Sequence, residues 1–192
     1  GVLLLTSSNY IKTRFFGATS KEPKILSLSN STIDVESVCR FQQDSLSINP
    51  GNSHIRMISD KPLFESVGPD PDTLYNLSFM PDTSLAHFNS TATTFNKIHF
   101  LRDVFLEGIS TSDTLQFEKG NSFVFSVRSD TIKKALIANG TCNQTITLRE
   151  PTGLSHFQFF MPPTSTVSCS HVNIRGSKAI GGANFTATNS SD

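Results

Sequence analysis

The chain has 192 residues, and its 16 basic residues balance 16 acidic ones, so the formal net charge is zero. This length is typical of one domain, and a balanced charge without a basic run argues against nucleic acid or an anionic membrane as a partner. Charged residues make up only 17% of the chain, against about 25% in an average protein. No apolar run reaches the roughly 18 residues of a membrane-spanning helix, so membrane insertion is not expected.

The chain begins with an uninterrupted aliphatic run of Val2, Leu3, Leu4 and Leu5. It has no initiator methionine or charged leader, and we therefore interpret it as a mature form whose leader has been removed. Residues 1–16 have two open interpretations. They form either a first strand of the chain's own sheet or an extension that completes the sheet of a neighbouring copy.

Apolar and polar side chains alternate along residues 17–183, as in strands with one buried and one solvated face. The alternating runs include residues 33–41, 75–79, 97–100, 122–128, 145–148 and 156–159. Turns containing Pro and Gly separate them, and this spacing predicts about 10 to 13 short strands. We therefore predict an all-β fold, a single β-sandwich of the jelly-roll type.

One segment departs from the alternation. Ile132, Ala135 and Leu136 follow helical spacing, either Ser129 or Asp130 can cap the start of a helix, and Gly140 can end it. The sequence therefore predicts a short helix over residues 130–139. Residues 184–192 are rich in hydroxyl side chains and are expected to form a polar, glycosylated tail.

The sequence contains little repetition of short motifs. Pro71-Asp72-Thr73 and Pro81-Asp82-Thr83 resemble each other, but two copies do not indicate a solenoid.

Asn-X-Ser/Thr sequons are unusually frequent. The chain has seven, where its composition gives about three by chance, and a sequon receives a glycan only on the secretory route. The sequons begin at Asn30, Asn76, Asn89, Asn139, Asn143, Asn184 and Asn189. We predict an extracellular or cell-surface glycoprotein with N-linked glycans; the alternative is that loops rich in Ser, Thr and Asn generate sequons incidentally.

Three cysteines fit an oxidising compartment with one disulfide and one free thiol. Cys142 and Cys169 enclose the shorter loop and are the expected pair, although spacing alone leaves the other pairings open. Cys39 continues an alternating apolar run and is expected to be buried.

No residue set carries a recognisable chemistry. The five histidines are scattered, and Ser155-His156 lacks the turn that exposes a serine nucleophile. Asp70, Asp72 and Asp82 could contribute oxygens to a calcium site, but the neighbouring prolines explain them equally well as turn residues. We predict no catalytic residue, no cofactor and no metal, and hence not an enzyme.

These features favour a structural protein of the extracellular space. We expect a self-assembling subunit of a filament or surface layer, in which Val2 to Leu5 donate a strand to another copy of the chain. The alternative is a monomeric adhesion or binding module that recognises a protein or a glycan on a secreted or viral surface.

Overall fold

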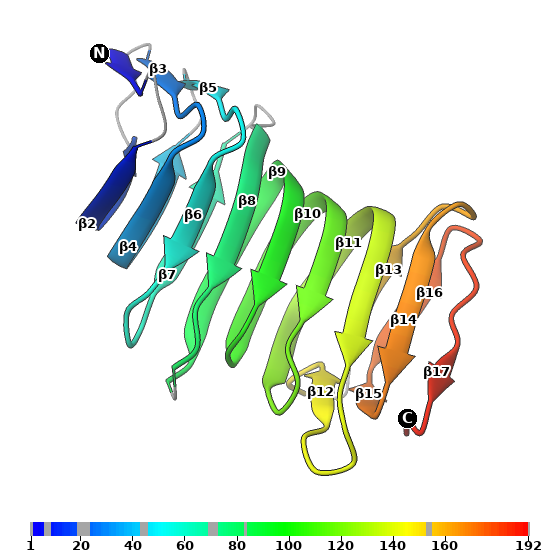
Figure 1. The fold of residues 1–192 in the computed structure, drawn as a ribbon. Coiled ribbons are helices and arrows are strands. Elements are labelled where there is room, and N and C mark those ends of the chain that lie inside the picture. The colour runs from blue at the N-terminus through cyan, green and yellow to red at the C-terminus, as the bar shows by residue number, and fades with distance from the viewer. Residues whose placement is uncertain are drawn as a thin grey trace.

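The computed structural model describes residues 2–5, 9–18, 24–42, 46–68, 73–82, 84–152 and 155–191. The chain is all-β, as predicted, but it forms a parallel β-solenoid of about 7 turns. Figure 1 shows the turns stacked along one axis, with the two ends of the chain at opposite ends of the stack. The predicted β-sandwich or jelly roll is therefore wrong.

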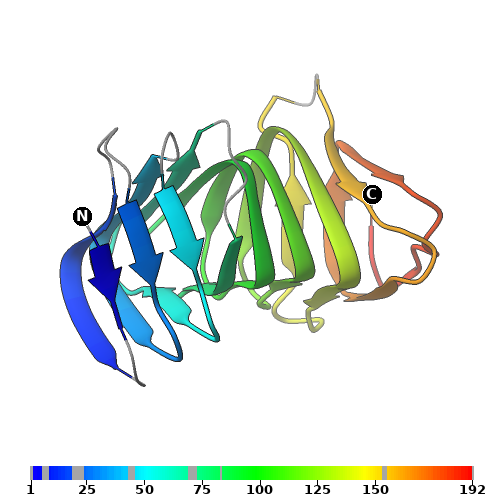
Figure 2. The ribbon, with the colours of Figure 1, turned by 90° about the horizontal axis from the view of Figure 1, so that it is seen from above.

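The strands are β1 (Val2–Leu4), β2 (Tyr10–Ala18), β3 (Lys24–Ser27), β4 (Thr32–Gln42), β5 (Leu46–Asn49), β6 (His54–Met57), β7 (Leu63–Val67), β8 (Thr73–Phe79), β9 (Ala86–Phe100), β10 (Val104–Phe117), β11 (Ser122–Asn139), β12 (Ile146–Arg149), β13 (Phe157–Phe160), β14 (Thr166–Ser170), β15 (Val172–Arg175), β16 (Ser177–Ile180) and β17 (Ala187–Thr188). Every ladder between them is parallel. Figure 2 shows from above how each strand lies beside its counterpart in the next turn.

Each turn contributes to three faces, which we number. Face 1 contains β6, β8, β14, β17 and the matching parts of β2, β4 and β9 to β11. Face 2 contains β7, β12, β15 and the other parts of the same long strands. Face 3 contains β1, β3 and β5 at one end, β13 and β16 at the other, and between them the start of β8 and the middle parts of β9 to β11. The long strands β9, β10 and β11 bend around the corners between faces.

The interior is built from columns of equivalent apolar residues. On face 1, one column contains Ile33, Ile55, Leu77, Ile98, Leu115 and Leu136, which are register partners in successive turns and all buried. The first four members follow one another along the chain at nearly equal intervals. The chain thus has an internal repeat, which the sequence motifs did not indicate.

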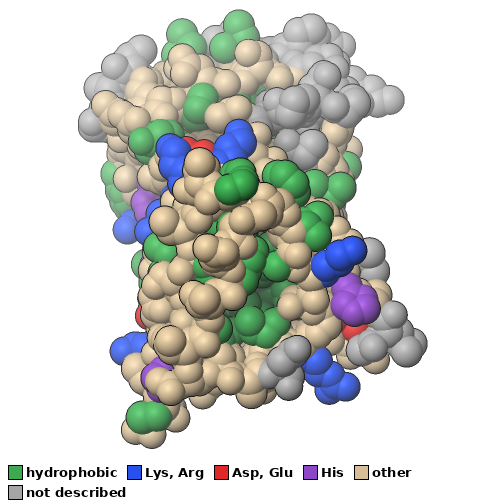
Figure 3. All heavy atoms as spheres, turned by 90° about the vertical axis from the view of Figure 1, so that its right-hand side faces the viewer, with side chains coloured by type: hydrophobic (Ala, Val, Ile, Leu, Met, Phe, Trp, Pro, Cys, Tyr) green, Lys and Arg blue, Asp and Glu red, His purple; other side chains and the backbone are tan. Residues whose placement is uncertain are grey.

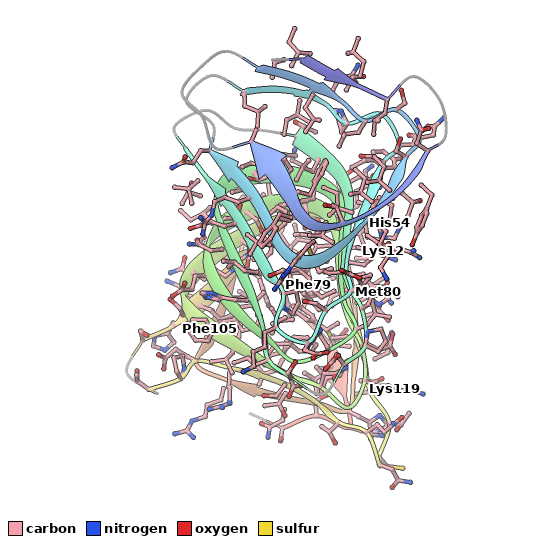
Figure 4. The ribbon with its side chains drawn as sticks, turned by 90° about the vertical axis from the view of Figure 1, so that its left-hand side faces the viewer. Lys12, His54, Phe79, Met80, Phe105 and Lys119 are labelled. Atoms are coloured by element: carbon pink, nitrogen blue, oxygen red, sulfur yellow. The ribbon has the colours of Figure 1, made fainter. Side chains whose placement is uncertain are left out.

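Most of the phenylalanines lie in the core, and several stack along the axis. Phe64 and Phe88 stack with ring centroids 5.4 Å apart, and Phe125 and Phe157 with centroids 4.1 Å apart. Figure 4 looks along the axis from the N-terminal end and shows Phe79 inside the coil, with His54 and Phe105 on opposite flanks. Inward positions of the predicted alternating runs such as Leu77, Ile98 and Phe123 are therefore confirmed as buried, and Cys39 is buried as expected, whereas Tyr75 is only half-buried.

The predicted helix over residues 130–139 is wrong, because this segment is the second half of β11. It pairs with β10, with one register shift between Ser112 and Thr114, and Ile132, Leu136 and Ala138 point into the core. Asp130 caps no helix. It is buried in an ion pair with Arg128, whose guanidinium lies 4.7 Å from the centre of the Phe88 ring. Pairing with a neighbouring turn has overridden a weak helical spacing.

A second buried arginine holds the corner between faces 1 and 2. Arg102 is fully buried and donates from Nη2 to the carbonyl oxygen of Asp60 at 2.6 Å and from Nε to that of Ser84 at 3.1 Å. It also donates to the carbonyl oxygen of Ser59 and lies 3.5 Å from the carboxylate of Asp82. One guanidinium thereby ties the corner loops of three successive turns together.

Candidate functional site

The apolar N-terminal run lies at one end of the solenoid. β1 pairs with β3 of the same chain, with Leu4 opposite Ser27, and Leu5 donates its N–H to the carbonyl oxygen of Ser27 at 2.9 Å. The N–H and C=O of Leu4 therefore point away from β3, toward the end of the solenoid. Leu5 packs against the core, whereas the Leu4 side chain is 57% exposed. In this structure the run is inserted into its own chain.

The remainder of the first turn is β2, which pairs with β4 and, among the described strands, with no other. Its inward side chains Ile11 and Phe16 pack against the core but are only half-buried. Its outward side chains Tyr10 and Phe15 are more than 60% exposed, at 63% and 62%. The first turn therefore presents an open strand edge and incompletely covered apolar side chains.

The opposite end of the solenoid has an apolar hollow of about 160 Å³. Figure 3 faces this end and shows hydrophobic side chains recessed at its centre. The hollow is lined chiefly by interior residues of the last turns, namely Leu136, Leu148, Phe159, Val167, Cys169 and Ile174, and by Phe185. These residues continue the core columns, so the hollow is the place where a further turn would put its own apolar side chains.

Residues 181–191, which we call the closing segment, run over this end. β17 pairs with β14, and the N–H of His171 donates to the carbonyl oxygen of Thr188 at 2.9 Å. Ser191 bonds to β15, as acceptor from Ile174 at 2.9 Å and as donor to Val172 at 3.0 Å. Of the expected polar tail 184–192, residues 184–191 are exposed but hydrogen-bonded to the last turn, and Asp192 lies outside the described residues.

The predicted sequons differ in accessibility. Asn30, Asn139, Asn143, Asn184 and Asn189 are the more accessible set, in turns, at a strand end or in the closing segment. Asn76 and Asn89 are half-buried, and the amide oxygen of Asn76 accepts a hydrogen bond from Asn96 at 3.0 Å. Each lies beside a buried neighbour in the sequence and points outward, as alternation predicts for Asn76. In a flat parallel sheet, however, each outward side chain is flanked by its neighbours in the adjacent turns.

The structure holds all three cysteines as free thiols, so the expected Cys142–Cys169 disulfide is not formed in it. Cys142 is exposed in the turn after β11, whereas Cys169 lines the hollow and is half-buried. Burial raises the pKa of the Cys169 thiol to about 11 and also raises the pKa of Cys39.

Face 1 carries a charged cluster near the N-terminal end. Asp34 accepts two hydrogen bonds from Arg56, at 2.6 and 2.7 Å, and one from the Tyr10 hydroxyl at 2.7 Å. Burial alone would raise the pKa of Asp34, but these hydrogen bonds outweigh it and hold the pKa below its ordinary value. The pKa of His54 is lowered by burial and by the charge of Arg56, and that of His99 by burial and by Lys97.

No chemical centre emerges from the part of the chain that the structure describes. Within it, no group of three or more His, Cys, Asp or Glu side chains could hold a metal ion. Asp70 and Asp72 of the possible calcium site lie outside the described residues, and Asp82 lies beside Arg102. The five histidines are distributed along the stack, and His156 is an exposed residue that precedes β13.

The described residues include no helix with the length and hydropathy needed to cross a bilayer. Comparison with known protein families, with curated proteins and with solved structures found no match to this chain. The two ends of the solenoid are thus the best candidate site. The first turn has an open strand edge and incompletely covered apolar side chains, and the last turns have an apolar hollow beneath the closing segment. Sequence reasoning singled out the first end through Val2 to Leu5. It missed the second, which only the repeat spacing could have indicated.

Proposed function

We propose that this chain is a structural subunit of an extracellular glycoprotein assembly and that copies stack end to end through their first and last turns. The observation that carries the proposal is the complementarity of the two ends. One end offers a hollow bounded by parallel strands, and the other offers a parallel turn with uncovered apolar side chains.

The same faces are present at both ends. On face 3 the first strand is β1 and the last is β16; on face 2 the first is the 15–18 part of β2 and the last is β15. A second copy placed at the end of the first would continue all ladders in the parallel sense, with Leu5, Ile11 and Phe16 facing the hollow. Main-chain pairing supplies strength in such strand addition, and apolar side chains supply the buried area.

The contact would be heterologous, because the two surfaces differ. A head-to-tail contact that does not close into a ring generates an open filament. This keeps the assembly role expected for Val2 to Leu5 but changes its geometry. The run would remain in its own chain and extend a sheet, instead of leaving the domain as a donated strand.

The experiment compares Leu4→Asp with a matched control, Ile109→Asp. The two side chains point outward and are similarly exposed, at 57% and 55%, but Leu4 lies at the open edge and Ile109 in the middle of the stack. A charge at an edge opposes edge-to-edge pairing, since association would desolvate it. We expect Leu4→Asp to abolish concentration-dependent association in sedimentation velocity, while Ile109→Asp associates as the unmodified chain does.

Expression through a secretory route tests the compartment in the same material. Intact mass should show glycans, most readily on the accessible sequons at Asn30, Asn139 and Asn143. An unmodified mass of 21.0 kDa would contradict the extracellular assignment. An unsubstituted chain that stays monomeric at all concentrations would contradict end-to-end stacking.

A second candidate is the adhesion module, favoured by one observation on the flank of the stack. Thr73, Thr94, Thr111 and Thr131 are register partners in successive turns and form an outward row of hydroxyls. Such a row could bind an uncharged glycan. A monomer that binds a glycan array, and loses this binding on Thr111→Lys, would favour the adhesion module over the assembly.

A further inference from the structure

The closing segment (residues 181–191) occupies the place that the proposed assembly needs. β17 takes the outer edge of β14 on face 1, and Ser191 bonds to the outer edge of β15 on face 2. These are the edges that β2 of a second copy would extend. Phe185 lies against the hollow that the side chains of that copy would fill. Segment and second copy therefore compete for one site.

The closing segment fills this site poorly. It contributes a two-residue strand, β17, where β2 would contribute nine residues. Its residues from 185 to 191 are exposed, and its one large apolar side chain, Phe185, is 38% exposed. A segment with few buried apolar groups and exposed hydrogen bonds belongs to the part of a structure that opens most easily.

A hinge joins the closing segment to β16. Gly181 and Gly182 have φ values of 104° and 93°, a region that other residues rarely adopt. A Cβ at Gly181 would lie 2.4 Å from the carbonyl oxygen of Met161. Two consecutive glycines at this point let the backbone leave the end of the solenoid in more than one direction.

We propose that the closing segment is a displaceable cap: it covers the apolar hollow in the single chain and swings away when the first turn of a second copy takes its place. This inference rests on the proposed function for the identity of the incoming partner. The opening of the cap, however, can be measured without any assembly. The segment would keep single copies from associating prematurely through an exposed apolar end.

The three free cysteines provide an internal set of reporters. Cys169 lines the hollow beneath the segment, Cys142 is exposed in a turn, and Cys39 is buried in the core. We therefore follow alkylation of each thiol by N-ethylmaleimide with peptide mass spectrometry. The alkylation rate of the exposed Cys142 corrects for differences in reagent concentration, and alkylation of the buried Cys39 reports any global unfolding.

The test variant is Phe185→Asp, and the control is Phe160→Asp. Phe160 is similarly exposed, at 41%, but does not line the hollow. Loss of the apolar contact of Phe185 should raise the alkylation rate of Cys169 relative to Cys142 by about 5- to 30-fold, as expected for a destabilisation of one or two kcal/mol. Cys39 should stay protected, and Phe160→Asp should leave the Cys169 rate unchanged.

A second measurement uses the unsubstituted chain. The amide of His171 donates to the closing segment, and the amide of Ser191 donates from it to β15. Both should exchange hydrogen faster than the amide of Ile146, which donates to the carbonyl oxygen of His171 between the last turns. Equal exchange rates, or a Cys169 rate that Phe185→Asp does not change, would overturn the displaceable cap.

Sedimentation velocity of the same variants separates the two proposals. Faster Cys169 alkylation together with association at lower concentration supports both. Faster alkylation without association at any concentration supports the cap and contradicts end-to-end stacking. Association of the unsubstituted chain with no change in alkylation supports stacking and overturns the cap.

Discussion

Arg102 shows how one side chain can set the shape of a corner. A buried guanidinium is costly unless its donors are paired, and here they meet backbone carbonyl oxygens of the corner loops. Burial lowers the pKa of Arg102 from its ordinary value, and the nearby carboxylates of Asp82 and Asp60 oppose that shift. Its planar fork reaches oxygens in several directions at once, which a lysine could not do.

We therefore predict that Arg102→Ala destabilises the fold by about 3 kcal/mol or more, because the fully buried guanidinium is the donor to the carbonyl oxygens of Ser59, Asp60 and Ser84, and the loss of each such bond costs roughly 1–3 kcal/mol where the acceptor is shielded from water. Arg102→Lys should lose part of this stability, since an ammonium reaches fewer of the oxygens. Urea denaturation curves measure both differences. Arg149, exposed on face 2, supplies the control, and Arg149→Ala should change the midpoint little.

The histidines of face 1 lead to a separate prediction, about how the stability of the chain depends on pH. Because the pKa values of His54 and His99 are lowered in the folded chain, the unfolded chain binds more protons as the pH falls below about 6.5. The free energy of unfolding is therefore expected to decrease as the pH falls from neutral through about 6.5. It should decrease again at acidic pH, because folding lowers the pKa of Asp34 and the unfolded chain therefore takes up a proton there first.

Denaturation midpoints at about pH 7.5 and 5.5 test the first step. His54→Gln combined with His99→Gln should remove most of the difference between the two midpoints. The charged groups that face these histidines are Arg56, Lys97, Asp34 and Glu118. An unchanged pH dependence in the double variant would assign the effect to other groups.

At the scale of strands, β10 illustrates the constraints of close stacking. Gly108 has a φ of 84°, and a Cβ there would lie 1.8 Å from the carbonyl oxygen of Ser90 in the turn before. The register between β10 and β11 shifts between Leu106 and Gly108. A glycine at this position allows the strand to bend around the corner between faces 2 and 3 while it stays in contact with both neighbours.

Gly108→Ala is predicted to destabilise the chain by more than about 2 kcal/mol, since backbone strain and a backbone clash act together. Gly120→Ala separates the two effects. Gly120 also has a positive φ, 78°, but a Cβ there would meet only the Gln144 side chain, at 3.7 Å. It should cost about 1–2 kcal/mol from strain alone. Similar losses in both variants, measured by thermal unfolding, would contradict the role of the Ser90 contact.

Alternation predicted the strands and their inward side chains but not the direction in which the strands pair. Ile98, Phe100, Phe123, Phe125 and Leu148 lie inside as expected. In most proteins a one-sided alternating pattern marks antiparallel sheets, because parallel sheets are usually covered on both faces. A solenoid is an exception: its parallel strands enclose the core on one side and meet water on the other.

The repeat that distinguishes a solenoid was hidden by uneven corner lengths. Ile33, Ile55, Leu77 and Ile98 are almost evenly spaced along the chain. Leu115, however, follows Ile98 after a distinctly shorter interval, and Val167 follows Leu136 after a much longer one. A search for repeated motifs fails under such variation, because only the inward positions must recur. For the same reason the hollow, which depends on where the columns end, could not be read from local patterns.

At the scale of the molecule, the turns form a one-dimensional stack in which each contacts mainly its neighbours. Stability in such a stack is close to a sum of turn and interface contributions, and the end turns need capping. The two ends of this chain differ in how they are covered. β1 and β2 lie open, whereas the closing segment covers the last turn. We expect the closing segment to be the first part of the structure to open.

The parallel ladders also have a mechanical consequence. Their hydrogen bonds run from turn to turn, along the axis of the stack. Tension applied between the two ends would therefore act on one end turn at a time, and each turn would unravel before the next is loaded. A turn of about 22 residues releases roughly 75 Å of extended chain. Under tension the stack would lengthen in many small steps while the remaining turns keep their core.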